Sequence, residues 1–195
     1  MPKAKSRKAA KVVVLIGSPR KKGNTAALAE QIAESASAAG ARVELCFLHG
    51  MNIRPCTACE ACHQPQGKGC IIEDDMQKVY PKLKEADAIV WASPIYWFTM
   101  SAQMKLAMDR CYALLGTEEH AFKGKRMALA FSYGGDDPFD SGCVNAIRTF
   151  QDAFGFIGAE IVGMVYGSAA AAGDIRSNAK VMGEAAELGR KLADP

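Results

Sequence analysis

Short β-branched runs alternate with helical segments along almost the whole chain, and this alternation limits the fold more than any other feature. Five runs have the composition of buried strands, at residues 11–18, 42–50, 87–94, 125–135 and 160–169. Helical patterns follow at residues 25–40, 74–85, 101–116, 142–158 and 174–193. Asp74 or Asp75, Ser101 and Asp174 are the expected N-caps of the second, third and fifth helices.

Such an alternation predicts right-handed crossovers and a parallel sheet with helices on both faces. At 195 residues the chain has the length of one domain. We expect a doubly wound α/β domain over residues 11–195, with five parallel strands in the order 2-1-3-4-5. Ligands of these folds bind beyond the carboxyl ends of strands 1 and 3, so a site is expected in the loops after the first, third and fourth strands.

Basic residues are concentrated at the N-terminus. The first eleven residues contain no acidic side chain and five basic ones, Lys3, Lys5, Arg7, Lys8 and Lys11. We expect residues 1–10 to form a flexible basic arm, and the remaining sequence has no basic excess that would indicate a nucleic-acid partner. No apolar run approaches the roughly 20 residues of a membrane span, and the run at 12–16 is too short for a secretory signal. We therefore expect a cytoplasmic protein that does not bind membranes.

The loop GSPRKKGNT at residues 17–25 joins the first strand to the first helix. Free backbone N–H groups and the helix dipole make such a junction an anion site. Ser18, Asn24 and Thr25 add polar groups, and Arg20 adds charge. The glycine spacing matches neither the P-loop nor the dinucleotide fingerprint. The loop therefore predicts a phosphate site of another kind.

Two further loops, SPIYWFTMSAQMK at 93–105 and SYGGDD at 132–137, complete a pattern with this one. The three loops, in this order, resemble the flavodoxin-like NAD(P)H-dependent FMN reductase family over residues 11–193. The resemblance implies a flavodoxin-like fold, FMN as cofactor, NAD(P)H as electron donor, and a homodimer or homotetramer. It implies a phosphate site made by Ser18, Arg20, Asn24 and Thr25. It also implies two edges for the flavin ring, one from Pro94, Ile95, Tyr96 and Trp97, and one from Ser132, Tyr133, Gly134 and Gly135.

Four of the seven cysteines, Cys56, Cys59, Cys62 and Cys70, lie within fifteen residues. The chain has too few cysteines for a disulfide scaffold, so metal or redox chemistry is the better explanation. The spacing C-x2-C-x2-C-x7-C is typical of iron–sulfur ligation, whereas four-cysteine zinc sites more often use two separated C-x-x-C pairs. The spacing favours a 4Fe-4S cluster and leaves zinc, an empty site or plain thiols as alternatives.

The cysteine-rich insertion at 53–72, with Pro55 before the cysteines and GCIIEDDM overlapping their end, resembles the iron–sulfur flavoprotein branch of the same family. That branch pairs FMN with a 4Fe-4S cluster in each subunit. Because the insertion follows the second strand, we expect its thiols at the same sheet edge as the flavin loops.

These features predict an FMN-dependent oxidoreductase that passes electrons from NAD(P)H or a ferredoxin, through FMN and the cluster, to an acceptor. No catalytic acid or base is visible in the sequence. The alternatives are an electron carrier without NAD(P)H turnover and a thiol or metal redox sensor. The aromatic segment IYWFTM at 95–100 is expected to be covered by a second subunit.

Overall fold

A computed structural model describes residues 8–67, 69–115 and 119–194. Its strands are β1 (Lys11–Ile16), β2 (Arg42–Phe47), β3 (Ala88–Tyr96), β4 (Thr99–Met100), β5 (Arg126–Tyr133) and β6 (Glu160–Ser168). Its α-helices are α1 (Asn24–Ala38), α2 (Met76–Glu85), α3 (Ala102–Arg110), α4 (Cys143–Ile157) and α5 (Ala179–Ala193). Short 3-10 helices lie at η1 (Leu48–Gly50), η2 (Ala61–His63), η3 (Cys111–Leu114) and η4 (Asp174–Ser177). Residues 1–7 of the predicted basic arm lie outside the described residues.

The main sheet has the order β2-β1-β3-β5-β6, and all of its neighbouring strands are parallel. This confirms the doubly wound sheet predicted from the alternating pattern. Strand β1 lies next to β2 and β3, and Val12 to Ile16 are all buried, as expected for a strand covered on both faces. One strand was not predicted, because β4 has only two residues, which pair antiparallel with the end of β3.

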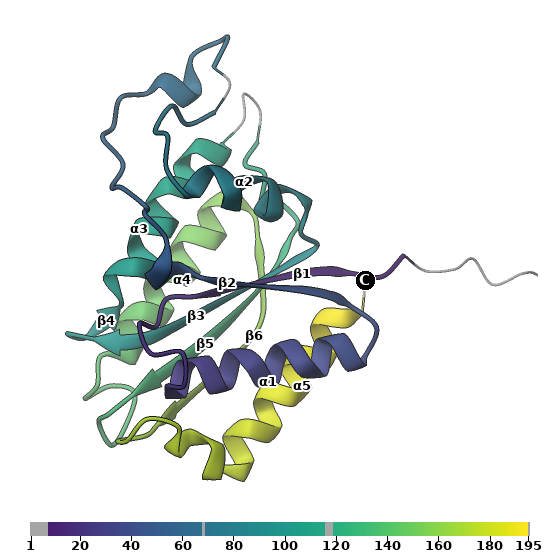
Figure 1. Cartoon of the computed structure of the whole chain (residues 1–195), viewed down its shortest axis with the longest axis vertical. Helices are drawn as coiled ribbons and strands as arrows, with labels where there is room; N and C mark the ends of the chain where they lie inside the picture. Colours follow the sequence, from purple (N-terminus) through teal and green to yellow (C-terminus); the bar gives the residue numbers. More distant parts are fainter. Residues whose placement is uncertain (1–7, 68, 116–118, 195) are drawn as a thin grey trace, which may run out of the picture.

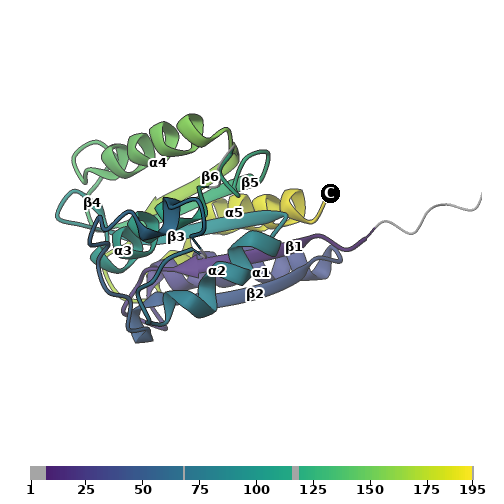
Figure 2. The same ribbon diagram turned by 90° about the horizontal axis from the view of Figure 1, so that it is seen from above.

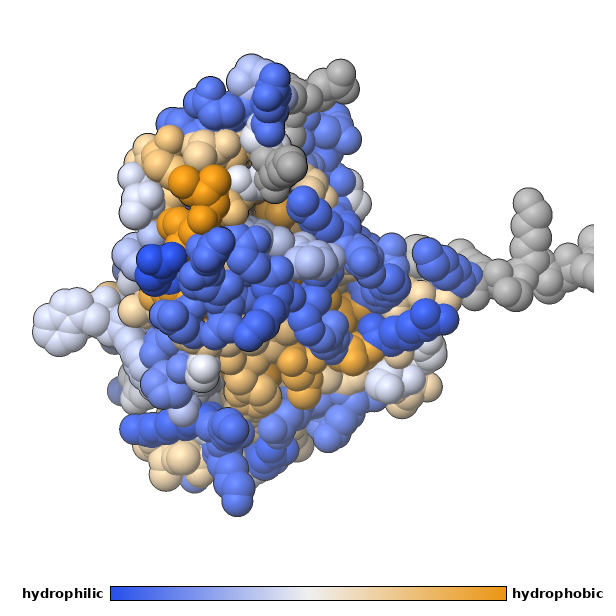
Figure 3. Space-filling view, turned by 45° about the horizontal axis from the view of Figure 1, so that its top comes forward, coloured by the Kyte–Doolittle hydropathy of each residue, from blue (hydrophilic) through white to orange (hydrophobic). Residues whose placement is uncertain are grey.

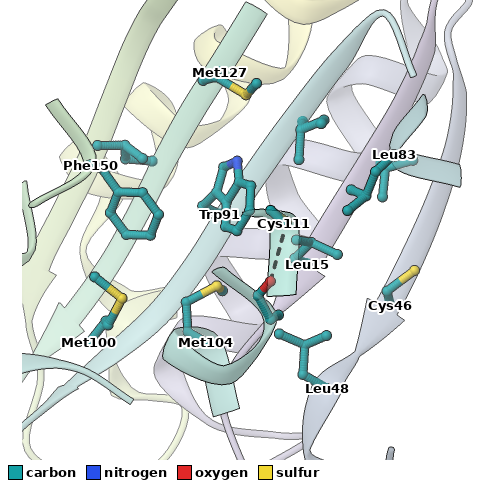
Figure 4. Packing of buried hydrophobic residues seen from close by; sticks show 14 of the residues in the cluster. Leu15, Cys46, Leu48, Leu83, Trp91, Met100, Met104, Cys111, Met127 and Phe150 are labelled. Carbon is teal, nitrogen blue, oxygen red and sulfur yellow. Dashed lines mark hydrogen bonds between the residues drawn. The ribbon is translucent and has the colours of Figure 1, made fainter. Parts of the chain in front are cut away.

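Helices cover both faces of the sheet, with α1 and α5 on one face and α2, α3 and α4 on the other (Figures 1 and 2). On the first face, Gly189 lets α5 approach α1 closely, since a Cβ there would lie 2.3 Å from the Ile32 carbonyl oxygen. On the second face, Trp91 packs against Phe150 (Figure 4). The ring centroids of Phe150 and Phe154 each lie 5.5 Å from that of Trp91. The sheet therefore separates two hydrophobic cores.

Two of the predicted helix starts agree with the structure and one does not. The Ser101 hydroxyl accepts a hydrogen bond from Met104 N and caps α3, and Asp75 is the N-cap residue of α2, where the Asp74 carboxylate accepts from Met76 N. The prediction that Asp174 caps the last helix is wrong. Asp174 begins the 3-10 helix η4, and the side chain of Asn178 caps α5.

Within the described ranges, none of the helices is both long and apolar enough to cross a membrane.

Candidate functional site

A hollow of about 150 Å³ opens at the carboxyl ends of β1, β3 and β5. Ten of the twelve residues predicted to contact the cofactor line it: Ser18, Arg20, Asn24, Thr25, Pro94, Ile95, Tyr96, Ser132, Tyr133 and Gly134. Trp97 and Gly135 do not line it, because Trp97 is 92% exposed and the Gly135 segment turns toward Ser168 and Ser141. The fold therefore assembles three separate loops into one site.

One end of the hollow is suited to an anion. It is formed by the loop after β1 and the N-terminus of α1, where Gly23 is the N-cap and makes no side-chain cap. The first-turn amides of a helix lack intrahelical partners, so they can donate to a bound anion. Gly23 keeps this end open, since a Cβ there would lie 2.9 Å from Arg20 Cβ and 3.6 Å from Ser18 Oγ. The exposed Arg20 adds a positive charge at the rim.

Two buried hydroxyls lie in the wall of the hollow. Thr25 Oγ1 and Ser132 Oγ are 2.7 Å apart and link the start of α1 to the end of β5. Both side chains belong to residues that are less than a tenth exposed. A hydroxyl that donates to its neighbour still has lone pairs to accept with, and one of the two protons is free to point at a ligand. The pair therefore supplies one donor to the hollow.

The side chain of Asn24, which lines the hollow, makes hydrogen bonds to the loop after β6. Its amide nitrogen donates to the carbonyl oxygens of Ala169 and Ala171, and its Oδ1 accepts from Gly173 N and Ile175 N. These four bonds use the side chain's main donors and acceptors. Asn24 therefore ties the loop after β6 to the start of α1, and its backbone amide is the group left for an anion.

The loop after β6 is the part of the site that the sequence did not predict. Ala169, Ala170 and Ala172 line the hollow together with the loops after β1, β3 and β5. The available signal was the run SAAAAG at residues 168–173, whose small side chains let the main chain approach a ligand closely. The switch-point rule points only to the loops after the first, third and fourth predicted strands, whereas this loop follows the fifth.

The other end of the hollow opens onto exposed aromatic side chains. Tyr96 is 42% exposed, Trp97 92% and Phe98 55%. Trp97 and Phe98 form the two-residue connection between β3 and β4, with φ values of 49° and 67°. Bulky residues rarely adopt this left-handed conformation, which costs roughly 1–2 kcal/mol per residue. Such strain is typical of a functional loop.

Tyr133 provides a neutral polar group in the wall. Tyr133 is one of the residues that line the hollow, and burial, followed by the nearby Cys143, Tyr166 and Asp137, raises the pKa of the phenol above its ordinary value. The hydroxyl therefore stays protonated at neutral pH and can donate a hydrogen bond.

All four clustered cysteines surround a second, smaller hollow. Cys56, Cys59, Cys62 and Cys70 line it, together with Tyr112 of η3. All seven cysteines of the chain are free thiols. Within the part of the chain that the structure describes, no three metal-binding side chains are close enough to hold one ion. The fold thus gathers the four thiols into one place, and the loop must close further for them to share a metal.

The loop around these thiols is held by polar contacts and backbone strain. Ala58 and Glu60 have φ values of 51° and 56°, in the left-handed region. The His63 ring contacts Tyr112 edge-on at 4.2 Å and hydrogen bonds to the Tyr112 carbonyl, so it points away from metal ligation. Hydrogen bonds from the Ala61 amide and the Thr57 hydroxyl lower the pKa of the exposed Cys59 thiol, whereas burial raises that of Cys62. Cys59 is therefore the more readily ionised of these two thiols.

The thiols lie farther from the flavin loops than the sequence predicted. The insertion leaves the sheet at the expected edge, but it rises to the top of the molecule in Figure 1 and packs over Tyr112, after the end of α3. The other hollow lies near the start of α3, where the Ser101 hydroxyl donates to Gly17 O. Nine helical residues separate these ends, about 14 Å at 1.5 Å per residue. Hydrophobic residues are exposed beside hydrophilic ones toward this upper end (Figure 3), and Ile71 is 64% exposed.

The fold and the two hollows define a flavodoxin-like α/β protein with a cofactor-type anion pocket and a separate thiol cluster. The chain belongs to the NADPH-dependent FMN reductase family, whose family model matches residues 10–174. It is 38% identical over 125 residues to an iron-sulfur flavoprotein of Archaeoglobus fulgidus, covering 64% of this chain and 62% of that one. It is 33% identical over 153 residues to an iron-sulfur flavoprotein of Methanosarcina thermophila, covering 78% and 77%.

Among solved structures, the Trp repressor binding protein from Bacillus subtilis superposes with a TM-score of 0.68 at 26% identity, covering 91% of this chain and 98% of that one. This likeness confirms the predicted flavodoxin-like fold. The chain spans 62% and 64% of the lengths of the first two iron-sulfur flavoproteins that it matches.

Proposed function

We propose that this protein is an FMN-dependent oxidoreductase that passes electrons from NAD(P)H, or from a ferredoxin, to an acceptor. The observation that carries the proposal is the polar hollow, where ten residues from three predicted loops meet at the carboxyl edge of the sheet. The membership of the chain in the NADPH-dependent FMN reductase family supports FMN as the cofactor and NAD(P)H as the donor. When bound, FMN supplies hydride and electron transfer, and no acid or base from the chain is assigned.

The residues around the hollow fit the parts of FMN. The α1 N-terminus, Ser18, Arg20 and the Thr25–Ser132 pair offer amides, hydroxyls and a charge to the phosphate. The hollow is smaller than the roughly 300 Å³ that ligand pockets usually need. The flavin ring would therefore extend from it along the exposed Tyr96, with Tyr133 and Gly134 at its other edge.

Exposed aromatic residues at this edge support a homodimer or homotetramer. In a single copy of the chain, the apolar surface of Tyr96, Trp97 and Phe98 would be exposed to water. A flavin ring bound beside these residues would be exposed as well. A second copy of the chain, seated over these residues, would cover both.

The four cysteines fit a 4Fe-4S cluster by the chemistry of their donors. They offer four thiols around one hollow, at a spacing typical of iron–sulfur ligation, and the relatives named iron-sulfur flavoprotein support this assignment. Zinc and an empty thiol site remain the alternatives that the experiment below separates.

The phosphate site is tested by the double variant Arg20→Gln, Thr25→Val. We expect it to weaken FMN binding by about 10- to 100-fold, because hydrogen bonds to charged groups contribute about 1.5–3 kcal/mol. FMN affinity is measured by fluorescence titration. Lys21→Gln is the matched control, since Lys21 is exposed and lies outside the hollow. An unchanged FMN affinity in the double variant would mean that the phosphate binds elsewhere.

The cluster is tested by chemical analysis of anaerobically reconstituted protein. We expect about four iron and four acid-labile sulfide per chain, the composition of a cubane on four thiolates. Cys59→Ser should lose most of both and keep FMN, whereas Cys46→Ala, which removes a buried cysteine outside the thiol hollow, should keep all three. Stoichiometric zinc without sulfide would overturn the cluster and leave the flavin site untouched.

A further inference from the structure

The cysteine segment, residues 55–73, projects from the folded domain. Hydrogen bonds join the residues at its two ends, and this junction forms a narrow neck. Arg54 N donates to Asp74 Oδ2 at 2.9 Å, and Asn52 N donates to Asp75 Oδ2 at 2.8 Å. Asp75 N in turn donates to Asn52 O at 3.0 Å. The two ends of the segment are therefore joined where they meet the folded core.

Arg110, the last residue of α3, reaches into this neck from below. Its Nη1 donates to Asp74 Oδ2 at 2.5 Å and to Arg54 O at 2.9 Å, so one nitrogen contacts both ends of the segment. Its Nη2 donates to Asp74 Oδ1 at 3.2 Å and to Cys70 Sγ at 3.3 Å. One side chain thus links both ends of the neck to a cysteine of the thiol hollow.

This ion pair is an unusual feature of the interior. The Arg110 side chain is 1% exposed and that of Asp74 is fully buried. Burying two charges is costly, and apolar residues of similar volume often stabilise a fold as well or better. Arg110 Nε also has no hydrogen-bond partner among the described residues. Stability of the fold alone therefore does not explain why a charged pair lies here.

The bond to Cys70 supplies an explanation. A neutral thiol is a weak acceptor, whereas a metal-bound thiolate is an anion that accepts charge-assisted hydrogen bonds. Hydrogen bonds and charges next to the sulfurs are among the factors that set the potential of an iron–sulfur cluster. A fixed cation beside Cys70 favours the more negative, reduced state.

We propose that Arg110 is a positioning residue of the thiol site, which holds Cys70 and both ends of the cysteine segment in place and raises the reduction potential of the cluster bound there. This role rests on the 4Fe-4S cluster of the proposed function. It explains the buried charge of Arg110, which lies outside the hollow proposed for FMN.

The test compares three variants of the full chain after anaerobic reconstitution. Arg110→Gln with Asp74→Asn removes both charges together, so no buried charge is left unpaired, and the Asn oxygen can still accept from one of the two amides, Arg54 N or Met76 N, that donate to Asp74. Arg110→Lys keeps the charge but not the forked contacts. Arg148→Gln with Asp152→Asn is the control, because it removes the same two charges from an exposed pair on α4.

FMN content and thermal unfolding report whether each variant folds, and iron, sulfide and a redox titration report on the cluster. We expect the Gln/Asn variant to lose most of its iron, or to hold a cluster whose potential is more negative than in the wild type. Arg110→Lys should be intermediate, and the control should match the wild type. The proposal is supported if the Arg110 variants lose the cluster while they stay folded and loaded with FMN, and if the control variant keeps its cluster.

Full iron and a wild-type potential in both Arg110 variants would overturn this role and leave the cluster assignment standing. A wild-type protein that binds FMN but no iron would overturn the cluster and the role of Arg110 together. The two failures are therefore distinguishable by the iron content of the wild type.

Discussion

At the scale of single residues, hydrogen bonds between distant loops decide what the Asn24 side chain does in the site. Ser18, Arg20 and Ser132 line the hollow as expected. Asn24 lies there too, but its amide is bonded to a loop some 145 residues away in the chain. Residue type and position after a strand are readable from sequence, whereas a long-range hydrogen bond depends on how the loops pack. The Arg110–Asp74 pair, whose residues lie 36 positions apart in the chain, is another contact of this kind.

The lowered pKa of His120 predicts how the stability of the fold depends on pH. Its ring accepts a hydrogen bond from Phe122 N and lies against the Cys111 carbonyl, and burial lowers its pKa from the usual 6.5. The folded state thus resists protonation more than the unfolded state. The resulting stabilisation is complete above pH 6.5 and is lost as the pH falls through the lower folded-state pKa.

We expect the melting temperature of the wild type to fall between about pH 7 and pH 5, a range above the titration of most carboxyl groups. His120→Gln, which does not titrate, should lose less over the same range, as measured by thermal unfolding in matched buffers. Equal slopes for the two proteins would show that His120 does not titrate on unfolding.

At the scale of elements, strand and helix patterns predicted the main sheet and the positions of the five α-helices that the structure describes. They did not predict the short elements. The two-residue β4 is too short to give a periodic signal. The closing helix begins at Ala179 and not at Asp174, because the Asp174 carboxylate accepts from Ala171 N and tightens the preceding turn. Local bonds of this kind compete with helix extension and are not visible in hydrophobic periodicity.

The two residues of the β3–β4 turn have a backbone conformation that is unfavourable for them, and its cost in stability can be tested. Asn and Gly are the residues that usually occupy a two-residue turn with positive φ, whereas this turn holds Trp97 and Phe98. Asn145 of α4 holds the turn, since its Nδ2 donates to Phe98 O, and Gly142, the N-cap of α4, makes room for it, since a Cβ there would lie 2.5 Å from Phe98 Cβ. The aromatic pair is therefore retained at a cost in stability.

We expect Trp97→Asn with Phe98→Gly to stabilise the chain by about 1 kcal/mol, a rise of a few degrees in melting temperature, because the strain is relieved and little packing is lost. The same variant should dissociate to monomer and bind FMN more weakly. Calorimetry, light scattering and FMN titration measure the three effects. A less stable variant that still assembles would show that the aromatic pair serves the fold.

At the scale of the whole molecule, the structure separates two sites that the sequence placed at one sheet edge. The hollow proposed for FMN lies near the start of α3, and the thiol hollow lies over its end. The sequence showed that both follow parallel strands, but the path of a long insertion depends on what it packs against. Here Tyr112 and Arg110, at the end of α3, hold it.

The proposed function requires that this chain binds FMN and that NAD(P)H reduces the bound FMN. The most direct measurement is the visible spectrum of anaerobically purified protein, after FMN loading and removal of free flavin, before and after addition of NADPH or NADH. We predict a bound flavin band that disappears when the nicotinamide is added and returns in air. A flavin band that stays unchanged with both nucleotides would contradict NAD(P)H turnover and favour an electron carrier, and a colourless protein would contradict the flavin site itself.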